Sequence, residues 1–365
     1  MKIVTVLGTR PQFIKAAPVC HAIVEYNQNI SDSSHGITEI ILHTGQHYEY
    51  NMSRILFEEI GIPEPQINLG VGSGPHGKQT GEMLTGIEEV VQREKPDWVV
   101  VYGDTNSTLS GTLAACKLNI PVVHVEAGLR SYNREMPEEH NRVITDHCSD
   151  LLLCPSETAV DNLEKEGIVK GVYLVGDTMC DGMLCGLESA KTRSNVLERL
   201  DLRAGEYYLA TLRRPYNTDA PEVLKEVAQG LLGLDRPVVL PAHPRTMSRL
   251  KKLDVYPELD PSRLKIISAV GYPDMLRLQE GARVILTDSG GMQKEAYFLG
   301  VPCVTLRPET EWVETVRLGW NVLVEPDRRQ IVDAVANFNT PAARPDLYGD
   351  GRAAYKSIAS YWTVD

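Results

Sequence analysis

The sequence lacks several features that would place it in a specialised class of protein. No apolar run reaches the roughly 18 residues that a membrane-spanning helix needs. The seven cysteines include no Cys-x-x-Cys pair, and the nine histidines show no His-Glu-x-x-His or other metal-binding spacing. The opening stretch 1–8 is too short for a signal peptide and predicts a strand. Scattered, unpaired thiols predict a reducing compartment, and we expect the cytoplasm.

Positive charge is also scarce in this chain. Lys and Arg number 37 against 49 Asp and Glu, which gives a formal net charge of −12. This balance argues against nucleic acid and anionic membranes as general partners, although a local group of cations can still bind an anionic small molecule. With 365 residues, the chain is long enough for two domains that each bury a core.

Short runs rich in Val, Ile and Leu alternate with helical patterns along nearly the whole chain. Strands of this composition are buried on both faces, as in parallel sheets covered by helices. The sequence therefore predicts an α/β protein with two doubly wound, Rossmann-like domains that face a cleft. We expect strands at 2–8, 39–44, 98–103, 121–125, 151–154, 172–175, 207–212, 237–241, 264–268, 283–287, 303–306 and 321–324, with a weaker one at 66–71.

No Gly/Ser-rich or Pro-rich linker marks the boundary between the two domains. We therefore expect a tight hinge near residues 176–186, after the last strand of the first half. The predicted N-terminal domain is 1–178 plus 347–365, and the predicted C-terminal domain is 179–346. The tail 347–365 carries four aromatic residues, so we expect it to return to the first domain as a packed helix.

The segment 287–296, Thr-Asp-Ser-Gly-Gly-Met-Gln-Lys-Glu-Ala, follows an apolar strand and begins a helix. A helix N-terminus attracts anions, and Gly290 and Gly291 after Ser289 let a diphosphate approach the backbone closely. Glu295, in the first turns of the same helix, suits the hydroxyls of a ribose. The pattern predicts a nucleoside-diphosphate site, and the alternative is an ordinary strand-to-helix turn with a capping serine.

A second anion site is indicated near the start of the chain. Gly-Thr-Arg-Pro-Gln-Phe-Ile-Lys at 8–15 follows the first strand and begins a helix. Arg10 and Lys15 lie where the helix dipole disfavours cations, which suggests that they serve an anionic ligand. The alternative is a pair of solvated charges. The G-x-G-x-x-G fingerprint of a dinucleotide site is absent from this turn.

Acidic side chains follow two predicted strands and begin a helix in the first half. Asp104 and Glu126 come just after strands, and Glu138 lies in Pro-Glu-Glu-His-Asn-Arg at 137–142. Carboxylates gathered at the ends of parallel strands are candidates for general acid and base catalysis. The alternative for Asp104 and Glu126 is turn capping or an ion pair with Arg130 or Arg142.

Two further patterns have weaker functional interpretations. Gly-Ser-Gly-Pro-His-Gly-Lys-Gln at 72–79 resembles a P-loop but ends in Gln where Ser or Thr would hold Mg²⁺, so we expect a mobile loop and no ATP site. Basic pairs at 213–214 and at His243 and Arg245 follow strands of the second half. These pairs suit either a ligand or a surface loop.

Taken together, the motifs resemble those of the non-hydrolysing UDP-N-acetylglucosamine 2-epimerases, which have the glycosyltransferase-B architecture. The resemblance covers essentially the whole chain in order. It includes Gly-Thr-Arg-Pro at 8–11, His-Thr-Gly-Gln-His at 43–47, Gly-Asp-Thr at 103–105, His-Val-Glu-Ala-Gly-Leu-Arg at 124–130, Pro-Glu-Glu-His-Asn-Arg at 137–142 and the segment 287–296.

The resemblance implies an isomerase that inverts C2 of a UDP-2-acetamido sugar by elimination and re-addition of UDP, with no metal or nicotinamide cofactor. Asp104, Glu126 and Glu138 are implied to be catalytic. The implied substrate-binding residues are Arg10, Lys15, Arg213, Ser289, Gly290, Gly291 and Glu295. Family analogy also implies a homodimer that serves cell-surface polysaccharide synthesis, and Gln46, His47 and His243 are candidates for a second UDP-sugar site.

Two departures from the family pattern keep alternatives open. Arg213 and Tyr216 replace a histidine and a glutamate of the usual His-Arg-x-Glu-Asn stretch, and Trp312 replaces an arginine, which removes a cation from near the nucleotide. Trp-Val-Glu at 312–314 resembles the subgroup of UDP-2,3-diacetamido-glucuronate 2-epimerases. UDP-N-acetylglucosamine remains the first substrate, with the uronate as an alternative. A retaining glycosyltransferase, a hydrolysing epimerase and a catalytically impaired UDP-sugar-binding protein are the other hypotheses.

Overall fold

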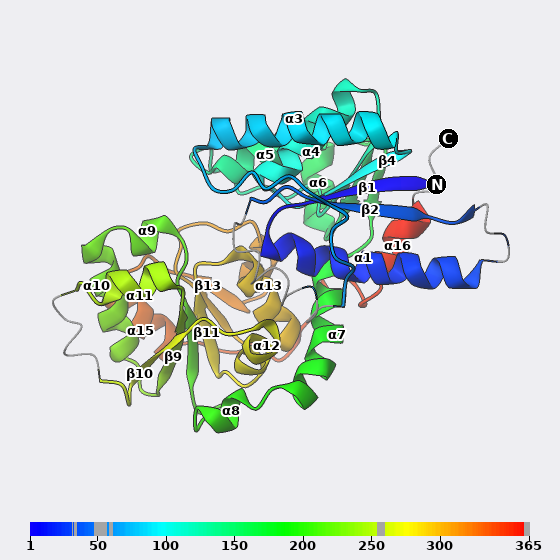
Figure 1. The fold of residues 1–365 in the computed structure, drawn as a ribbon. Helices are drawn as coiled ribbons and strands as arrows, with labels where there is room; N and C mark the ends of the chain where they lie inside the picture. Colours follow the sequence, from blue (N-terminus) through cyan, green and yellow to red (C-terminus); the bar gives the residue numbers. More distant parts are fainter. Residues whose placement is uncertain (31, 33–34, 47–56, 58–60, 254–259, 361–365) are drawn as a thin grey trace. The chain divides into compact units, whose positions relative to one another are not determined.

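The computed structural model describes residues 1–30, 32, 35–46, 57, 61–253 and 260–360. The chain forms two compact units, each built around its own sheet (Figure 1). Unit 1 consists of residues 1–184 and 346–365, and unit 2 consists of residues 185–345. Within the described residues, no helix is both long enough and apolar enough to span a membrane.

Unit 1 contains a seven-stranded parallel sheet in the order β3-β2-β1-β4-β5-β6-β7. The strands are β1 (Lys2–Leu7), β2 (Thr38–His43), β3 (Ile67–Asn68), β4 (Trp98–Tyr102), β5 (Val122–Val125), β6 (Leu151–Cys154) and β7 (Val172–Leu174). The helices are α1 (Arg10–Asn29), α3 (His76–Glu94), α4 (Asn106–Lys117), α5 (Pro137–Cys148), α6 (Glu157–Lys165), α7 (Thr178–Arg193) and α16 (Ala353–Ser360).

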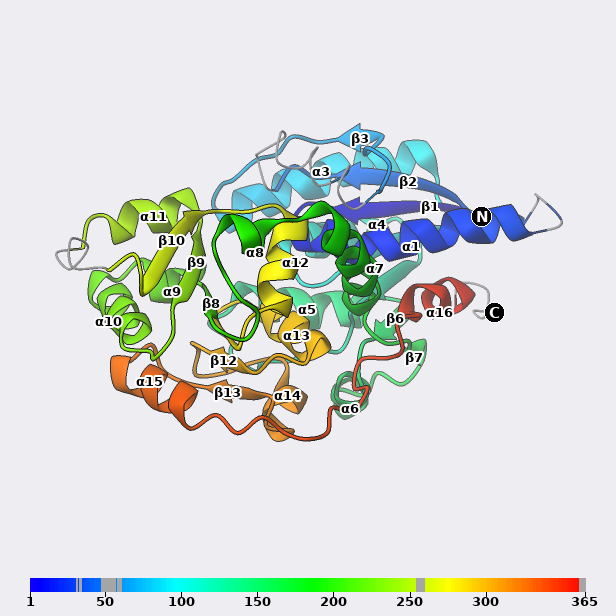
Figure 2. The same ribbon diagram turned by 90° about the horizontal axis from the view of Figure 1, so that it is seen from below.

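Both faces of this sheet are covered by helices, which explains its unbroken apolar strands. In Figures 1 and 2, α3, α4 and α5 lie over one face, and α1 and α16 lie over the other. On the first face, Val4 and Val6 of β1 and Val99 and Val101 of β4 pack with buried side chains of α3 and α4. Alternate residues of the same strands, such as Ile3 and Val100, are also fully buried, so both faces of these strands contribute to a core.

Unit 2 contains a six-stranded parallel sheet in the order β10-β9-β8-β11-β12-β13. The strands are β8 (Tyr208–Thr211), β9 (Val238–Ala242), β10 (Leu264–Ser268), β11 (Val284–Thr287), β12 (Cys303–Thr305) and β13 (Asn321–Leu323). The helices are α8 (Val196–Arg199), α9 (Pro215–Thr218), α10 (Pro221–Leu232), α11 (Pro244–Leu250), α12 (Tyr272–Glu280), α13 (Gly290–Leu299), α14 (Val313–Arg317) and α15 (Arg328–Ala336).

Alternate residues of the unit 2 strands belong to two separate cores. Tyr208 and Ala210 pack with α10 and α15 on one face, whereas Leu209 between them packs with α8, α12 and α13 on the other. This doubly wound arrangement is the one that the sequence pattern predicts. The fold prediction is therefore confirmed at the level of two α/β sheets.

All twelve firmly predicted strands are present, and their ends differ from the predicted ones by at most one residue. The weaker strand predicted at 66–71 shortens to β3. The prediction of a loop through residue 79 is wrong, because α3 begins at His76 and Gln79 lies in its first turn. The buried Gln79 donates from Nε2 to the Gly72 carbonyl at 2.7 Å, which ties the glycine-rich turn to the helix.

The chain passes between the units after Leu184, inside α7, and again after Pro345. The sequence analysis places these two crossings after residues 178 and 346. Its division of the chain into two domains at these residues remains a prediction. All seven cysteines, each in the described part of the chain, are free thiols.

The C-terminal segment is anchored to unit 1 by backbone groups. Asp177 donates its N–H to the Tyr348 carbonyl at 2.8 Å, and Gly176, with φ +94°, leaves no room for a Cβ beside that carbonyl. Four residues on, Asp181 accepts the Ala354 N–H of α16 at 2.8 Å. Burial raises the pKa of Asp181 to about 6, despite the hydrogen bonds that it accepts from the α16 backbone.

The raised pKa of Asp181 predicts a loss of stability as the pH increases. Between about pH 4, where an unfolded Asp ionises, and pH 6, the folded chain holds one extra proton, so its free energy of unfolding falls across this window. Asp181→Asn keeps an acceptor for Ala354 but cannot ionise. Its stability relative to the wild type should therefore increase by up to about 3 kcal/mol from pH 4 to pH 7, as measured by urea unfolding.

Asp260→Asn is the matched control for this experiment. Its side-chain hydrogen bond with Ser262 lowers the pKa of Asp260, so its contribution to stability changes with pH in the opposite direction. A difference in unfolding free energy between Asp181→Asn and the wild type that does not change with pH would contradict a raised pKa of Asp181.

Candidate functional site

The turn between β1 and α1 is locked to the end of β4 by a buried amide. Oε1 of Gln12 accepts the Gly8 and Thr9 N–H groups at 2.8 and 3.1 Å. Its Nε2 donates to the Tyr102 carbonyl at 2.9 Å and to Thr108 Oγ1 at 3.0 Å. One glutamine thus satisfies polar groups at the ends of two neighbouring strands, a role that the sequence analysis did not assign to it.

One helical turn after this point, Lys15 reaches the carboxylate of Glu126. Its Nζ pairs with Glu126 Oε2, and the two side chains are only 13% and 6% exposed. The alternative predicted from sequence, a pair between Glu126 and Arg130 or Arg142, is not the pair that the structure shows. Arg10, at the first position of α1, is half-buried and has other contacts in the structure.

Glu126 itself has an unusual backbone conformation. Its φ is +72°, a left-handed value that a non-glycine residue adopts at a cost of about 1–3 kcal/mol. Both its N–H and that of Ala127 donate to the Leu153 carbonyl of β6, which holds this turn at the end of β5. Such outliers persist where the surrounding structure over-determines them, and they cluster at functional sites.

Asp104, just past β4, is paired with a different cation. Its Oδ2 accepts from Arg142 Nη2 at 2.7 Å and from Nε at 3.0 Å, and its carbonyl accepts from Asn141 Nδ2 at 2.9 Å. The Asp104 side chain remains 31% exposed, whereas that of Arg142 is 3% exposed. The ion pair expected as an alternative for Asp104 is therefore present, and it leaves the carboxylate open to a ligand.

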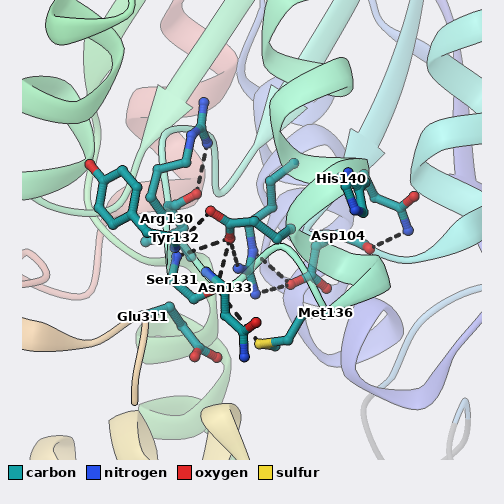
Figure 3. A network of polar contacts seen from close by, with 12 residues as sticks. Asp104, Arg130, Ser131, Tyr132, Asn133, Met136, His140 and Glu311 are labelled. Carbon is teal, nitrogen blue, oxygen red and sulfur yellow. Dashed lines mark hydrogen bonds and ion pairs between the residues drawn. The ribbon is translucent and has the colours of Figure 1, made fainter.

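The same arginine also binds a buried carboxylate in the first turn of α5. Arg142 Nη1 donates to Glu139 Oε2 at 2.7 Å. Glu139 also accepts from the Ser131 hydroxyl and N–H, each at 2.9 Å, and from the Tyr132 N–H at 2.8 Å. Burial opposes the charge on Glu139, but these donors and Arg142 together lower its pKa. Figure 3 shows Asp104, Ser131 and Tyr132 in one network of polar contacts.

Glu138, the predicted catalytic member of this acidic pair, is half-buried in the first turn of α5 and has contacts of its own. Glu139 is the residue that orders the segment before the helix. The sequence does contain a signal for it, because Glu139, Arg142 and Asp146 are spaced i, i+3 and i+7 and therefore share one face of α5.

Asp146, at the end of this helix face, belongs to a buried chain of charges. Its Oδ1 lies 2.6 Å from Nδ1 of His124, and its Oδ2 accepts from Arg130 Nη1 at 2.7 Å. Arg130 in turn donates from Nε and Nη2 to the two carboxylate oxygens of Glu166 at 2.7 and 2.8 Å. The sequence analysis did not predict a partner for His124.

In unit 2, the central turn is organised by Asp288, at the end of β11. Its fully buried carboxylate accepts the backbone N–H groups of Arg213 and Arg214 at 3.0 Å and Asn217 Nδ2 at 3.1 Å. Burial raises the pKa of Asp288, and the donated hydrogen bonds oppose this effect. Asp288 therefore brings the end of β8 beside the start of α13.

The predicted diphosphate turn lies directly after this carboxylate. Ser289 is the N-cap residue of α13, and Ser289, Gly290 and Gly291 are half-buried. A Cβ on Gly290 would overlap Glu311 Oε1, so a larger residue here would displace the Glu311 side chain. Glu295, in the second turn of α13, is mostly buried and accepts a hydrogen bond from Gln279 Nε2 at 2.8 Å.

Trp312 does not leave this region without a cation. Lys294 of α13 is only 1% exposed, and its Nζ lies 4.1 Å from the centroid of the Trp312 ring. Such a desolvated cation–π contact is worth about 2 kcal/mol. The expectation that Trp312 removes a cation from near the nucleotide remains a prediction, and Lys294 is the cation that lies against its ring.

The remaining predicted residues lie at the ends of strands or in adjoining loops. Arg213 is exposed after β8, and Tyr216 donates its hydroxyl to Glu325 at 3.0 Å. His243 is the exposed N-cap residue of α11, where its Nδ1 accepts the Arg245 N–H at 3.3 Å. Gln46 accepts from the Ser107 hydroxyl at 2.7 Å. His47 lies outside the described residues, so the second-site hypothesis remains a prediction.

A metal centre finds no support within the described part of the chain, where no group of three or more His, Cys, Asp or Glu side chains is arranged to hold an ion. In unit 2, the start of α13 suits an anion such as a phosphate group. In unit 1, carboxylates lie beside cations, an arrangement suited to acid–base chemistry.

Comparisons with known proteins agree with this arrangement. A family model described as UDP-N-acetylglucosamine 2-epimerase matches residues 29–361. Over 362 residues, the chain is 49% identical to a UDP-N-acetylglucosamine 2-epimerase homolog of Methanococcus maripaludis, with 98% of each chain covered. Over 369 residues, it is 45% identical to the UDP-2,3-diacetamido-2,3-dideoxy-D-glucuronate 2-epimerase of Pseudomonas aeruginosa, with 99% of each covered.

Solved structures give the same result. The UDP-GlcNAc 2-epimerase of Methanocaldococcus jannaschii, in complex with UDP-GlcNAc and UDP, matches with a TM-score of 0.89 and 43% identity over 98% of this chain and 99% of that chain. This likeness confirms the predicted glycosyltransferase-B architecture.

The close packing at Gly8 generates a stability prediction. A Cβ at this position would overlap the hydroxyl oxygens of Ser107 and Thr44, which hydrogen-bond to each other at 2.8 Å. Gly8→Ala should therefore destabilise the protein by about 1–3 kcal/mol. Gly81→Ala, with no atom within 4 Å of the added Cβ in α3, should instead be neutral or stabilising by up to about 1 kcal/mol. Equal stability of the two variants in urea unfolding would contradict the proposed packing.

Proposed function

We propose that this chain, which belongs to the UDP-N-acetylglucosamine 2-epimerase family, inverts C2 of UDP-N-acetylglucosamine to give the manno epimer. The family is shown by the match over residues 29–361 and by 49% identity to a relative along nearly its whole length. The observation that carries the activity is that Asp104 and Glu126, at the ends of adjacent strands, each lie against a cation. Such carboxylates are suited to moving a proton beside a departing anion.

The proposed reaction has two steps, and its product has the same composition as the substrate. UDP leaves C1 with the electron pair of the C1–O bond while a base removes the C2 proton, which forms a C1=C2 double bond. A proton then adds to the opposite face of C2, and the UDP oxygen bonds to C1 again. Because the C2 proton is not acidified by a carbonyl group, stabilising the departing diphosphate is the main electrostatic task.

We assign that task to the start of α13 and to local cations. The backbone N–H groups at Ser289, Gly290 and Gly291 and the positive end of the helix dipole suit a diphosphate. Glu295 is assigned to the ribose hydroxyls. Its position behind the turn supports this role, since a carboxylate nearer the phosphates would repel them.

The acid and base roles are assigned to unit 1. Asp104, Glu126 and Glu138 come from the ends of two strands and the start of a helix, so they can serve different faces of one sugar ring. Arg10 and Lys15 are assigned to the substrate. The contact between Lys15 and Glu126 supports a role for the lysine in holding this carboxylate when no substrate is present.

Three further assignments rest on the family and on composition. We propose a homodimer in the cytoplasm that supplies an activated sugar for a cell-surface polysaccharide, and the seven free thiols suit a reducing compartment. We also keep Gln46, His47 and His243 as candidates for a second UDP-sugar site. A binding stoichiometry above one sugar nucleotide per chain would support that site.

A second candidate substrate is UDP-2,3-diacetamido-2,3-dideoxy-glucuronate. One observation favours it: Asp288 fixes the backbone of Arg213 beside the start of α13, and the arginine side chain is exposed there. A guanidinium in this place suits a sugar carboxylate. The relative from Pseudomonas aeruginosa that is named for this substrate is 45% identical to the chain.

The epimerase proposal predicts loss of turnover when any catalytic carboxylate is neutralised. Asp104→Asn, Glu126→Gln and Glu138→Gln should each lower kcat by about 10²–10⁴-fold, because proton transfer loses its acid or base. Proton NMR in D₂O with UDP-N-acetylglucosamine should show the manno epimer with deuterium at C2 for the wild type. UDP binding by calorimetry should be retained in all three variants, and Glu135→Gln serves as an exposed control. Wild-type turnover in one variant would remove that residue from the mechanism.

The substrate can be tested through Arg213. If this arginine binds a uronate, Arg213→Gln should lower kcat/KM for the diacetamido-glucuronate by about 30-fold, which corresponds to about 2 kcal/mol for a charge-assisted hydrogen bond. Its effect on UDP-N-acetylglucosamine should be much smaller. Arg203→Gln, an exposed arginine before β8, is the control. Equal losses with both sugars would assign Arg213 to the diphosphate instead.

A further inference from the structure

His124 is a buried titratable residue that the proposed reaction does not use. It lies in β5, two residues before Glu126, and its side chain is 0% exposed. Both ring nitrogens have a close polar partner in unit 1. Since a buried polar group must be satisfied, these partners determine which protons the ring carries.

The proton on Nε2 follows from its partner. Nε2 lies 2.7 Å from the carbonyl oxygen of Gly103, at the end of β4. A carbonyl oxygen can only accept a hydrogen bond, so Nε2 must carry a proton and donate it. This requirement determines the protonation of Nε2.

The proton on Nδ1 follows from the state of Asp146. Nδ1 lies 2.6 Å from Asp146 Oδ1, and the other oxygen of this carboxyl accepts from Arg130 Nη1 at 2.7 Å and from the Gly128 N–H at 3.2 Å. Burial acts to raise the pKa of Asp146, but the net shift is downward, and the guanidinium of Arg130 and the Gly128 N–H stabilise the ionised carboxylate independently of His124. An ionised carboxylate has no proton to give, so Nδ1 must also donate.

We propose that His124 is held as a doubly protonated imidazolium and acts as a positioning residue, fixing the Gly103–Asp104 peptide and thereby the separation of the Asp104 and Glu126 carboxylates. The role as stated rests on the proposed epimerase function, because only that function requires both carboxylates. The protonation state does not rest on it.

The carbonyl that His124 holds belongs to a peptide with little other support. On one side, the Tyr102 carbonyl accepts from Gln12 and Thr108, and the Gly103 N–H donates to the Val125 carbonyl at 3.0 Å. On the other side, the Asp104 carbonyl accepts from Asn141 at 2.9 Å. The Gly103 carbonyl lies between these two fixed points, and His124 is its donor.

Rotation of this peptide would disturb both catalytic carboxylates. Gly103 has φ +65°, and a Cβ there would lie 3.1 Å from Glu126 Oε2 and 3.2 Å from Lys15 Nζ. The turn thus packs directly against the pair formed by Lys15 and Glu126, while the next residue along is Asp104. His124 is connected to Glu126 through the backbone at the end of β5. It acts on Asp104 through its hydrogen bond to the carbonyl of the preceding residue, Gly103.

The charge on His124 is balanced by groups from every element around it. Asp146 faces it from α5, and Arg130, on the segment after β5, binds the other side of Asp146. Glu166, after α6, neutralises Arg130, and His147 lies 3.8 Å from Glu166 at the outer end. Burial and the nearby charge of Asp146 both raise the pKa of the Cys154 thiol in β6. This thiol therefore stays uncharged. On the Gly103 side, the charged groups are Lys15, Glu126 and Asp104.

The protonation state can be measured directly on the wild-type protein. NMR of protein labelled with ¹⁵N-histidine should show both ring nitrogens of His124 protonated at pH 7, as its two hydrogen-bond partners require. The exposed His35 and His140 provide reference signals in the same spectra. A single unprotonated nitrogen on His124 at pH 7 would overturn the assignment of charge.

The positioning role is tested by two substitutions. His124→Phe removes both hydrogen bonds and should lower kcat by about 10²-fold with KM and the Kd for UDP unchanged, as expected when reacting groups are misplaced. His124→Gln can still donate an amide N–H to the Gly103 carbonyl and should recover part of the lost kcat. Wild-type kcat in His124→Phe, or no recovery in a folded His124→Gln, would overturn the positioning role.

These measurements separate the two proposals. If the wild type incorporates no deuterium at C2 of any UDP-sugar, the proposed function fails, and the nitrogen spectra still test the charge on His124. If the wild type is an epimerase and His124 is neutral, the inference fails alone.

Discussion

Parallel strands of one sheet end at the same edge, where their last peptide groups have no neighbouring strand to pair with. In unit 1, the register sets Val6 beside Val101 and Val101 beside His124, so β1, β4 and β5 end together. The polar backbone at this edge has to be satisfied by side chains. Gln12 and His124 do so for the end of β4, and the positions of Asp104 and Glu126 depend on these two residues.

The charges at this edge are arranged as alternating pairs. Lys15 contacts Glu126, Arg142 lies between Asp104 and Glu139, and Arg130 lies between Asp146 and Glu166. Burying such pairs costs desolvation energy that their attraction repays only with good geometry, so they are poor sources of stability. Their value here is positional, since the cations hold these carboxylates in defined places. An acidic chain thereby retains local cations for an anionic ligand.

The fold was predictable from sequence because its strands are unbroken apolar runs, such as Val99–Val101, that only a covered parallel sheet accommodates. Candidate site residues at strand ends, such as Asp104 and Glu126, followed from the same pattern. Partners that approach from other elements did not. Asp288 binds the backbone of Arg213, 75 residues away, and such a side-chain-to-backbone contact leaves no signature in side-chain types. The helical spacing of Glu139 and Arg142 indicates their pairing, but not the backbone N–H groups that Glu139 also binds. The helical start of α3 was missed because glycine and proline at 72–77 obscured it.

The path of the chain has a consequence for how the protein is made. Unit 1 needs α16, whose N–H at Ala354 binds Asp181 and whose helix packs beside α1, yet residues 185–345 of unit 2 are synthesised in between. At ribosomal speeds of about 5–20 residues per second, this interval is on the order of 10–30 s. Throughout that time, the surface of α1 that α16 covers is exposed on the nascent chain. Unit 2, although encoded second, is the first unit whose residues are all available, and unit 1 is completed only when the last helix leaves the ribosome.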